Sequence, residues 1–192
     1  MLSYKESLKI LKETEAIQEG HFILSSGLHS SMYVQCALLL SYPDKANKIS
    51  ESLCEKIKNE FKNIDLVLSP ALGGVVVGYE VGRLLKTRTI FAERVNGSLQ
   101  LRRGFKIPEK SNVLVVEDVI TTGKSALECA ELIKSNKANL LGYTCIIDRS
   151  DKNLLIKNKI ISQIKISIDS YDEKSLPEEL KKIPSSSPGS KK

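Results

Sequence analysis

Short apolar runs alternate with amphipathic segments along most of the chain. Such runs fit strands that are buried on both faces, whereas apolar residues three and four positions apart fit helices that cover a sheet. Strands are predicted at residues 66–68, 89–92, 113–116 and 143–147. Helices are predicted at residues 43–61, 75–86 and from 125 onward. This alternation indicates an α/β fold in which helices flank a central parallel sheet.

The two ends of the chain have a different pattern. An amphipathic helix is predicted from Tyr4 to about Ala16, and residues 20–36 fit two short extended pieces around a Ser-Gly turn. Alternation at 154–156 and 160–168 predicts short antiparallel strands, before a final helix at 177–182. We therefore divide the chain into an N-terminal segment 1–40, an α/β core 41–150, a C-terminal segment 151–183 that completes the domain, and a disordered tail 184–192.

Polar residues follow each of the four predicted core strands. They are Ser69 with the glycines after it, Glu93-Arg94, Glu117-Asp118 and Asp148-Arg149. In a parallel sheet the carboxyl ends of the strands lie at one edge, and ligands bind outside that edge. We therefore expect all four clusters to contribute to one site.

The stretch from Val113 to Ser125 carries the strongest signal. A buried strand ends in the acid pair Glu117-Asp118, and the hydroxyl-rich turn 121–123 leads into a helix. Backbone N–H groups, hydroxyls and a helix N-terminus around one point form a cradle for a phosphate group. The two carboxylates cannot bind that phosphate, but they suit ribose hydroxyls or a Mg²⁺ held between a sugar and a pyrophosphate.

This stretch has two other possible interpretations. Gly123-Lys124-Ser125 suggests a Walker A loop, but that motif needs a glycine five positions before Gly123, where Asp118 stands. A carboxylate there would repel the phosphates, so we reject the P-loop. An ordinary strand-to-helix loop with polar caps is the other alternative.

Residues 95–111 show no clear period and contain Arg102, Arg103 and Lys106. We predict a long, mobile, basic loop, and loops of this length in compact domains are usually functional. From composition alone, a merely solvated charged loop is equally compatible. The position of the segment directly before the acid-pair strand favours a functional loop.

Composition limits the possible function classes. The chain of 192 residues, with 41% hydrophobic and 27% charged residues, suits one globular α/β domain. A net charge of +6 favours anionic ligands only weakly. Aromatic residues make up 5% and tryptophan is missing, which leaves few stacking platforms for bases. We therefore expect no nucleic-acid partner.

Cysteine and apolar patterns indicate the compartment. The four cysteines form no C-x-x-C pair and only two histidines are present, which argues against structural zinc and for buried thiols in a reducing environment. No apolar run approaches the length of a membrane span, and the first residues lack the character of a signal peptide. The expected location is the cytoplasm, without a membrane partner.

Together these motifs resemble the type I phosphoribosyltransferases, most closely those specific for orotate. Residues 113–125 are similar to the family's motif for phosphoribosyl diphosphate (PRPP), and 22–30 to its N-terminal signature. Residues 69–74 resemble its pyrophosphate loop, and 91–94 with 101–105 resemble its catalytic-loop region. Asp148-Arg149 resembles its acid-arginine pair for the substrate carboxylate.

The resemblance implies a Rossmann-like fold with a PRPP-binding core and a small hood built from the N- and C-terminal segments. It implies the transfer of the 5-phosphoribosyl group from PRPP to orotate, giving orotidine 5′-monophosphate and pyrophosphate in pyrimidine (UMP) biosynthesis. Mg²⁺ is the implied cofactor, held mainly by PRPP and its pyrophosphate, with no metal ligand expected from the protein. It also implies a homodimer in which the mobile loop reaches the neighbouring site.

The resemblance also implies roles for individual residues. The expected catalytic residues are Asp118 and the loop arginines Arg102 and Arg103, and which arginine acts stays open. Orotate would contact Thr121, Arg149 and Tyr33, although Tyr33 could equally be a packed core residue. The expected PRPP contacts are Glu117, Asp118, Val119, Ile120, Thr121, Thr122, Gly123, Lys124, Ser125, Arg94, Leu72 and Gly73.

The chain departs from the family pattern at two points. Many relatives have a lysine where Ser25 stands, and many have another a few residues after the arginine that matches Arg94. Arg102 or Arg103 would have to supply the second charge.

Two related functions compete with this interpretation. A phosphoribosyltransferase for a neutral purine or uracil would give Arg149 no carboxylate to bind. A regulator that keeps the fold without turnover would be expected to lose the acids or the loop arginines, and both are present.

Overall fold

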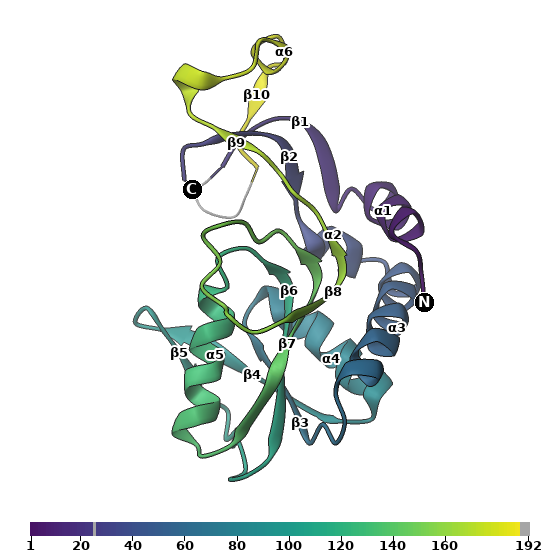
Figure 1. Cartoon of the computed structure of the whole chain (residues 1–192), viewed down its shortest axis with the longest axis vertical. Coiled ribbons are helices and arrows are strands. Elements are labelled where there is room, and N and C mark those ends of the chain that lie inside the picture. The colour runs from purple at the N-terminus through teal and green to yellow at the C-terminus, as the bar shows by residue number, and fades with distance from the viewer. Residues whose placement is uncertain (25, 189–192) are drawn as a thin grey trace.

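Two sheets organise the computed structural model, which describes residues 1–24 and 26–188 (Figure 1). The larger sheet has the order β5-β4-β3-β6-β7-β8. All its neighbouring strands pair parallel except β5, which is antiparallel to β4. Its strands are β3 (Leu66–Pro70), β4 (Arg88–Val95), β5 (Ser98–Leu101), β6 (Asn112–Ile120), β7 (Asn139–Asp148) and β8 (Ile160–Lys165).

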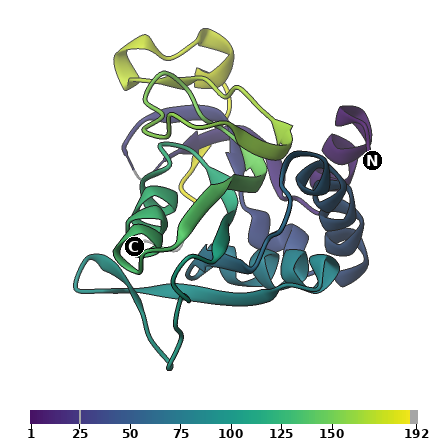
Figure 2. The same cartoon turned by 60° about the horizontal axis from the view of Figure 1, so that its bottom comes forward.

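Helices cover both faces of this sheet (Figure 2). Alternate strand residues point to opposite faces, and two apolar cores result. Val67 and Leu114 join the core with the first four helices, whereas Leu68 and Val115 join the core with α5. The predicted α/β fold is therefore confirmed. The helices are α1 (Tyr4–Glu13), α2 (Cys36–Leu40), α3 (Pro43–Glu60) and α4 (Gly73–Leu85) on one face, and α5 (Lys124–Ser135) on the other.

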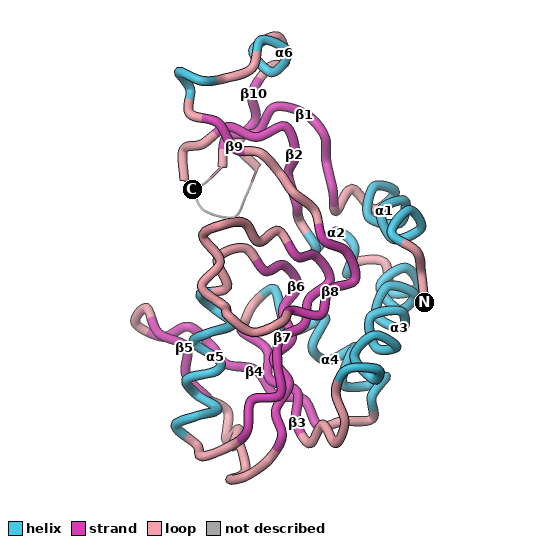
Figure 3. Tube along the Cα trace, viewed as in Figure 1, coloured by secondary structure: helices cyan, strands magenta, loops and turns pink. Residues whose placement is uncertain are grey.

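A second, four-stranded sheet with the order β10-β1-β2-β9 forms a hood (Figure 3). Its strands come from both ends of the chain, as the N- and C-terminal colours of Figure 1 show, which confirms the predicted hood. The hood consists of β1 (Ile17–Ile23), β2 (His29–Val34), β9 (Ser170–Tyr171), the 3₁₀ helix η1 (Glu173–Ser175), α6 (Glu178–Lys181) and β10 (Ser185–Ser186).

The segment 95–111, predicted as one long loop, begins instead with a β-hairpin. Asn96 and Gly97 both have positive φ (48° and 85°), as a two-residue hairpin turn requires. The turn joins β4 to β5, so only the part after Leu101 is a connection. The Asn96-Gly97 dipeptide is the sequence signal for this turn.

The C-terminal expectations also need correction. β8 pairs parallel with β7, not antiparallel, and residues 154–156 are not a strand. In the tail predicted to be disordered, β10 pairs with β1 at Phe22, whereas residues 189–192 lie outside the described residues. The N-terminal helix ends at Glu13, not near Ala16.

The connections place a topological switch point at the carboxyl edge of the core sheet. From β3 the chain crosses through α4 to β4 on one side, and then returns to β6 on the other side of β3. Loops that leave adjacent strands in opposite directions open a space for ligands at this switch point. The carboxyl ends of β3 and β6 face the hood (Figure 1).

Candidate active site

A small cavity lies where β6 ends and α5 begins. It has a volume of about 80 Å³ and is lined by Glu117 and residues 119–126. Gly123 precedes the helix with φ 78°, a conformation that disfavours any side chain. The Lys124 amide donates to Thr122 Oγ1 at 3.4 Å. The predicted hydroxyl-rich turn thus lies around one opening at a helix N-terminus, where an anion is stabilised.

The acid pair lies beside the N-terminus of α4. A Cβ atom built on Gly73 would be 2.8 Å from Asp118 Oδ2, and one on Gly74 would be 3.2 Å from Glu117 Oε1. A side chain at Gly73 would displace the Asp118 carboxylate from this position. The positive end of the α4 dipole therefore faces the two carboxylates. The Ala71–Leu72 peptide before it is cis.

Glu117 and Asp118 differ in their surroundings. Burial, followed by the nearby Asp118 charge, raises the pKa of Glu117 to about 9. Glu117 is therefore uncharged at neutral pH and can donate a hydrogen bond as well as accept one. Asp118 Oδ1 accepts the backbone N–H of Val119 at 2.9 Å.

Arg149 of the core and Tyr33 of the hood lie near enough to influence each other electrostatically. Arg149 follows β7, while Tyr33 lies on β2 of the hood. Burial lowers the pKa of Arg149, and the Tyr33 hydroxyl lies near enough to oppose that shift. The Tyr33 ring packs on Phe22, with 5.7 Å between ring centroids. Within residues 1–24 and 26–188, Arg149 has no carboxylate partner, so the site offers a half-buried guanidinium to an anion.

The Asp148 carboxylate contacts Lys165 and the backbone of Ser150. Its Oδ2 lies 3.3 Å from Lys165 Nζ, and its Oδ1 accepts the Ser150 N–H at 2.8 Å. These contacts hold the loop after β7, and the joint role of Asp148 and Arg149 toward a substrate carboxylate stays a prediction.

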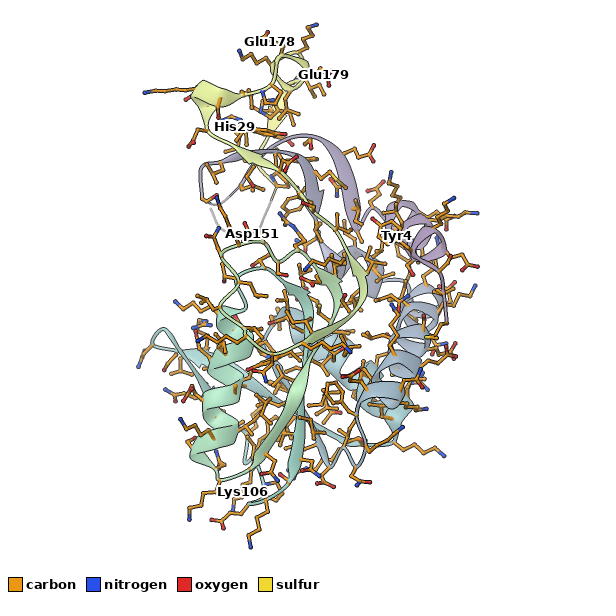
Figure 4. All side chains as sticks on the ribbon, viewed as in Figure 1. Tyr4, His29, Lys106, Asp151, Glu178 and Glu179 are labelled. Carbon is orange, nitrogen blue, oxygen red and sulfur yellow. The ribbon has the colours of Figure 1, made fainter. Side chains whose placement is uncertain are left out.

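The arginines expected to act on the leaving group do not line the cavity. Arg94 pairs with Glu128 on α5 at 2.9 Å, and Arg103 pairs with Glu93 at 2.8 Å. The Arg103 guanidinium also lies over the Phe91 ring. The chain then runs to Lys106 at the end of the molecule opposite the hood (Figure 4).

The described part of the chain holds no group of three or more His, Cys, Asp or Glu side chains that fits a metal ion. The acid pair offers hard carboxyl oxygen atoms of the kind that Mg²⁺ prefers, but two side chains are too few for a site made by protein alone. None of the described helices is long and apolar enough to cross a bilayer.

Comparison with known proteins supports one assignment. A family model described as the phosphoribosyl transferase domain matches residues 41–181. The chain is 42% identical over 187 residues to the orotate phosphoribosyltransferase of Parvibaculum lavamentivorans, covering 95% of this chain and 96% of that one. It is 44% identical over 185 residues to the protein of the same name from Caldicellulosiruptor saccharolyticus, with 96% of each chain covered. The chain belongs to the orotate phosphoribosyltransferase family.

Solved structures agree with the family assignment at the level of the fold. The orotate phosphoribosyltransferase of Aeropyrum pernix has a TM-score of 0.68 and 23% identity, covering 82% of this chain and 92% of that one. An adenine phosphoribosyltransferase has a TM-score of 0.63 and 18% identity, covering 81% and 99%. Proteins named for different bases thus share this fold, so specificity must be argued from side chains.

Proposed function

We propose that the protein transfers the 5-phosphoribosyl group of PRPP to orotate, giving orotidine 5′-monophosphate and pyrophosphate in pyrimidine biosynthesis. The observation that carries this proposal is the half-buried Arg149, without a carboxylate partner among the described residues, beside Tyr33 and the anion cradle. A guanidinium binds a carboxylate through two parallel hydrogen bonds. Orotate has that carboxylate, whereas uracil and the purines do not.

The cradle and the acid pair would hold PRPP. Residues 121–125 take the 5-phosphate, and Glu117 and Asp118 take the ribose hydroxyls. Neutral Glu117 can accept from one hydroxyl and donate to another oxygen. Substitution at the anomeric carbon develops oxocarbenium character, and Asp118 beside the ring stabilises that positive charge.

The leaving pyrophosphate needs positive charge. Leu72 and Gly73 would offer backbone N–H groups at the start of α4. Mg²⁺ that arrives on PRPP would neutralise part of the charge on the departing group. Arg94 and Arg103 already have carboxylate partners. Arg102 forms no ion pair within the described residues, and we propose it as the loop arginine that acts.

A homodimer is the proposed assembly, with the loop after β5 reaching the neighbouring site. Its support is an exposed apolar stripe on and before α4, formed by Leu72 (86% exposed), Val76 (51%) and Tyr79 (66%). These residues are four and three positions apart, so they share one face of the helix. Exposed apolar faces of this kind favour association. Light scattering after size exclusion tests it: we expect a dimer for the wild type and a monomer for Val76→Glu, and a monomeric wild type would refute it.

Orotate consumption, followed by absorbance with PRPP and Mg²⁺, tests the reaction. Parallel assays contain uracil, hypoxanthine or adenine. We expect Mg²⁺-dependent loss of orotate alone. Turnover of another base would refute the Arg149 argument, and PRPP binding without any turnover would instead indicate a regulator.

The proposed cytoplasmic location is supported by four buried, free cysteines.

A further inference from the structure

The loop of residues 149–156, here called the brace loop, contacts the outer side of the phosphate cradle. The Arg149 amide donates to the Ile120 carbonyl at 2.8 Å, and the Leu155 amide donates to the Thr122 carbonyl at 2.9 Å. Ile156 packs on Gly123 so closely that a Cβ there would lie 2.7 Å from Ile156 Cδ1. The brace loop therefore touches the end of β6, the turn and the residue that precedes α5.

Internal contacts hold the brace loop in this conformation. Asp151 Oδ1 accepts the Asn153 N–H at 2.7 Å, and Asp148 Oδ1 accepts the Ser150 N–H at 2.8 Å. Lys165 Nζ donates to Ser150 Oγ at 3.2 Å. Figure 4 shows Asp151 on the side of the core that faces the hood. The loop is thus fixed by its own hydrogen bonds and by β8.

Neither Leu155 nor Ile156 lines the cavity itself. Their contacts act on Thr122 and Gly123, whose backbone sets the direction of the first N–H groups of α5. Those N–H groups form hydrogen bonds to an anion only in a narrow range of angles. A small rotation at Gly123 would misalign the donors without unfolding the helix.

We propose that the brace loop positions the phosphate cradle relative to the Arg149 guanidinium, with the Leu155 amide and the Ile156 side chain as positioning groups for the 5-phosphate of PRPP. This inference rests on the proposed function. One hydrogen-bonded loop begins with the proposed orotate-binding arginine and ends against the cradle, so it sets the separation of the two bound substrates. Holding two reactants at the correct separation lowers the barrier to a reaction between them.

A matched pair of variants isolates the amide. The Leu155 side chain is 55% exposed, so Leu155→Ala keeps the N–H and removes only surface contacts. Leu155→Pro removes the N–H that binds Thr122. We expect the KM for PRPP to rise about tenfold in Leu155→Pro and to stay within about twofold of wild type in Leu155→Ala. The KM for orotate should change by less than about threefold in both.

Variants of Ile156 test the same proposal if Leu155→Pro does not fold. Ile156→Ala opens a gap beside Gly123 and should raise the KM for PRPP about fivefold, while Ile156→Val should restore most of the wild-type value. A lower Tm with an unchanged KM for PRPP would show that these residues only stabilise the fold, and would overturn the proposal. Equal increases of both KM values would overturn the assignment to the cradle.

Calorimetric titration with PRPP and Mg²⁺ separates this proposal from the reaction itself. If the wild type binds PRPP but does not consume orotate, the proposed function fails. Weaker PRPP binding by Leu155→Pro and Ile156→Ala, with Leu155→Ala unchanged, would still support the brace loop. Unchanged PRPP binding in all three variants would overturn it.

Discussion

Different kinds of contact stabilise the core sheet and the hood. In the core, β6 and β7 have nine and ten residues, and Leu53 on the covering helix α3 is fully buried. In the hood, β9 and β10 have two residues each, and the buried side chains include His21 and Ser30. The core depends on apolar burial, which is non-directional and strong. The hood depends more on directional polar contacts.

A pair of histidines links the N-terminal and C-terminal parts of the hood. One ring nitrogen of His21 lies 2.9 Å from the Ile183 carbonyl oxygen, and the other lies 2.7 Å from His29 Nδ1. His21 and Ile183 are 162 residues apart. A contact over so long a stretch has a large loop-closure entropy unless the chain between its ends is already folded. The hood should therefore form after the core, and open before it.

The largest effect is expected from comparing one buried leucine in each region. Leu53→Ala should lower the free energy of unfolding by about 3 kcal/mol, because it leaves a cavity in the apolar core. Leu180→Ala on α6 should cost about 1 kcal/mol, because the hood can relax around it, and should mainly raise the KM for orotate. Urea denaturation and kinetics measure the two effects. Equal losses of stability would show that the hood packs around Leu180 as tightly as the core packs around Leu53.

Arg149 lies where the two regions meet, and its loss should affect the binding of the two substrates differently. Arg149→Ala should raise the KM for orotate about 100-fold through the loss of a bidentate, charge-assisted contact. Affinity for PRPP should stay within about threefold, because the cradle belongs to the core. Arg149→Lys should recover little, since an ammonium group cannot form the paired contact. Unchanged orotate kinetics would remove the basis for specificity.

A smaller effect is expected from Glu117, and it depends on pH. Its pKa is raised from 4.5 to about 9 by burial in the core. Between these values the folded protein binds more protons than the unfolded chain, so this residue makes stability fall as the pH rises. Glu117→Gln should therefore be more stable than wild type at pH 8 by at least about 1 kcal/mol, with little difference near pH 5. Tm values across this range measure it, and a constant difference would contradict the raised pKa.

Local sequence determined much of the core and of the cradle. Apolar runs identified β3, β6 and β7, because strands buried on both faces need continuous apolar residues. The acid pair and the turn 121–123 could be recognised before α5, because all the residues of this motif lie within a few positions of one another. The hairpin at Asn96-Gly97 belongs to the same class, since its turn signal is local.

Tertiary structure alone decided the contacts between distant segments. Alternation at 160–168 predicted a strand but not the strand that pairs with it. In the structure, β8 extends the core sheet beside β7 and pairs parallel with it. Asp148 contacts Lys165, and Ile156 packs on Gly123. These residues are too far apart in the sequence for a local pattern to predict the contacts. Periodicity specifies which face of a segment must be buried, but the surface that buries it exists only once the other segments have packed.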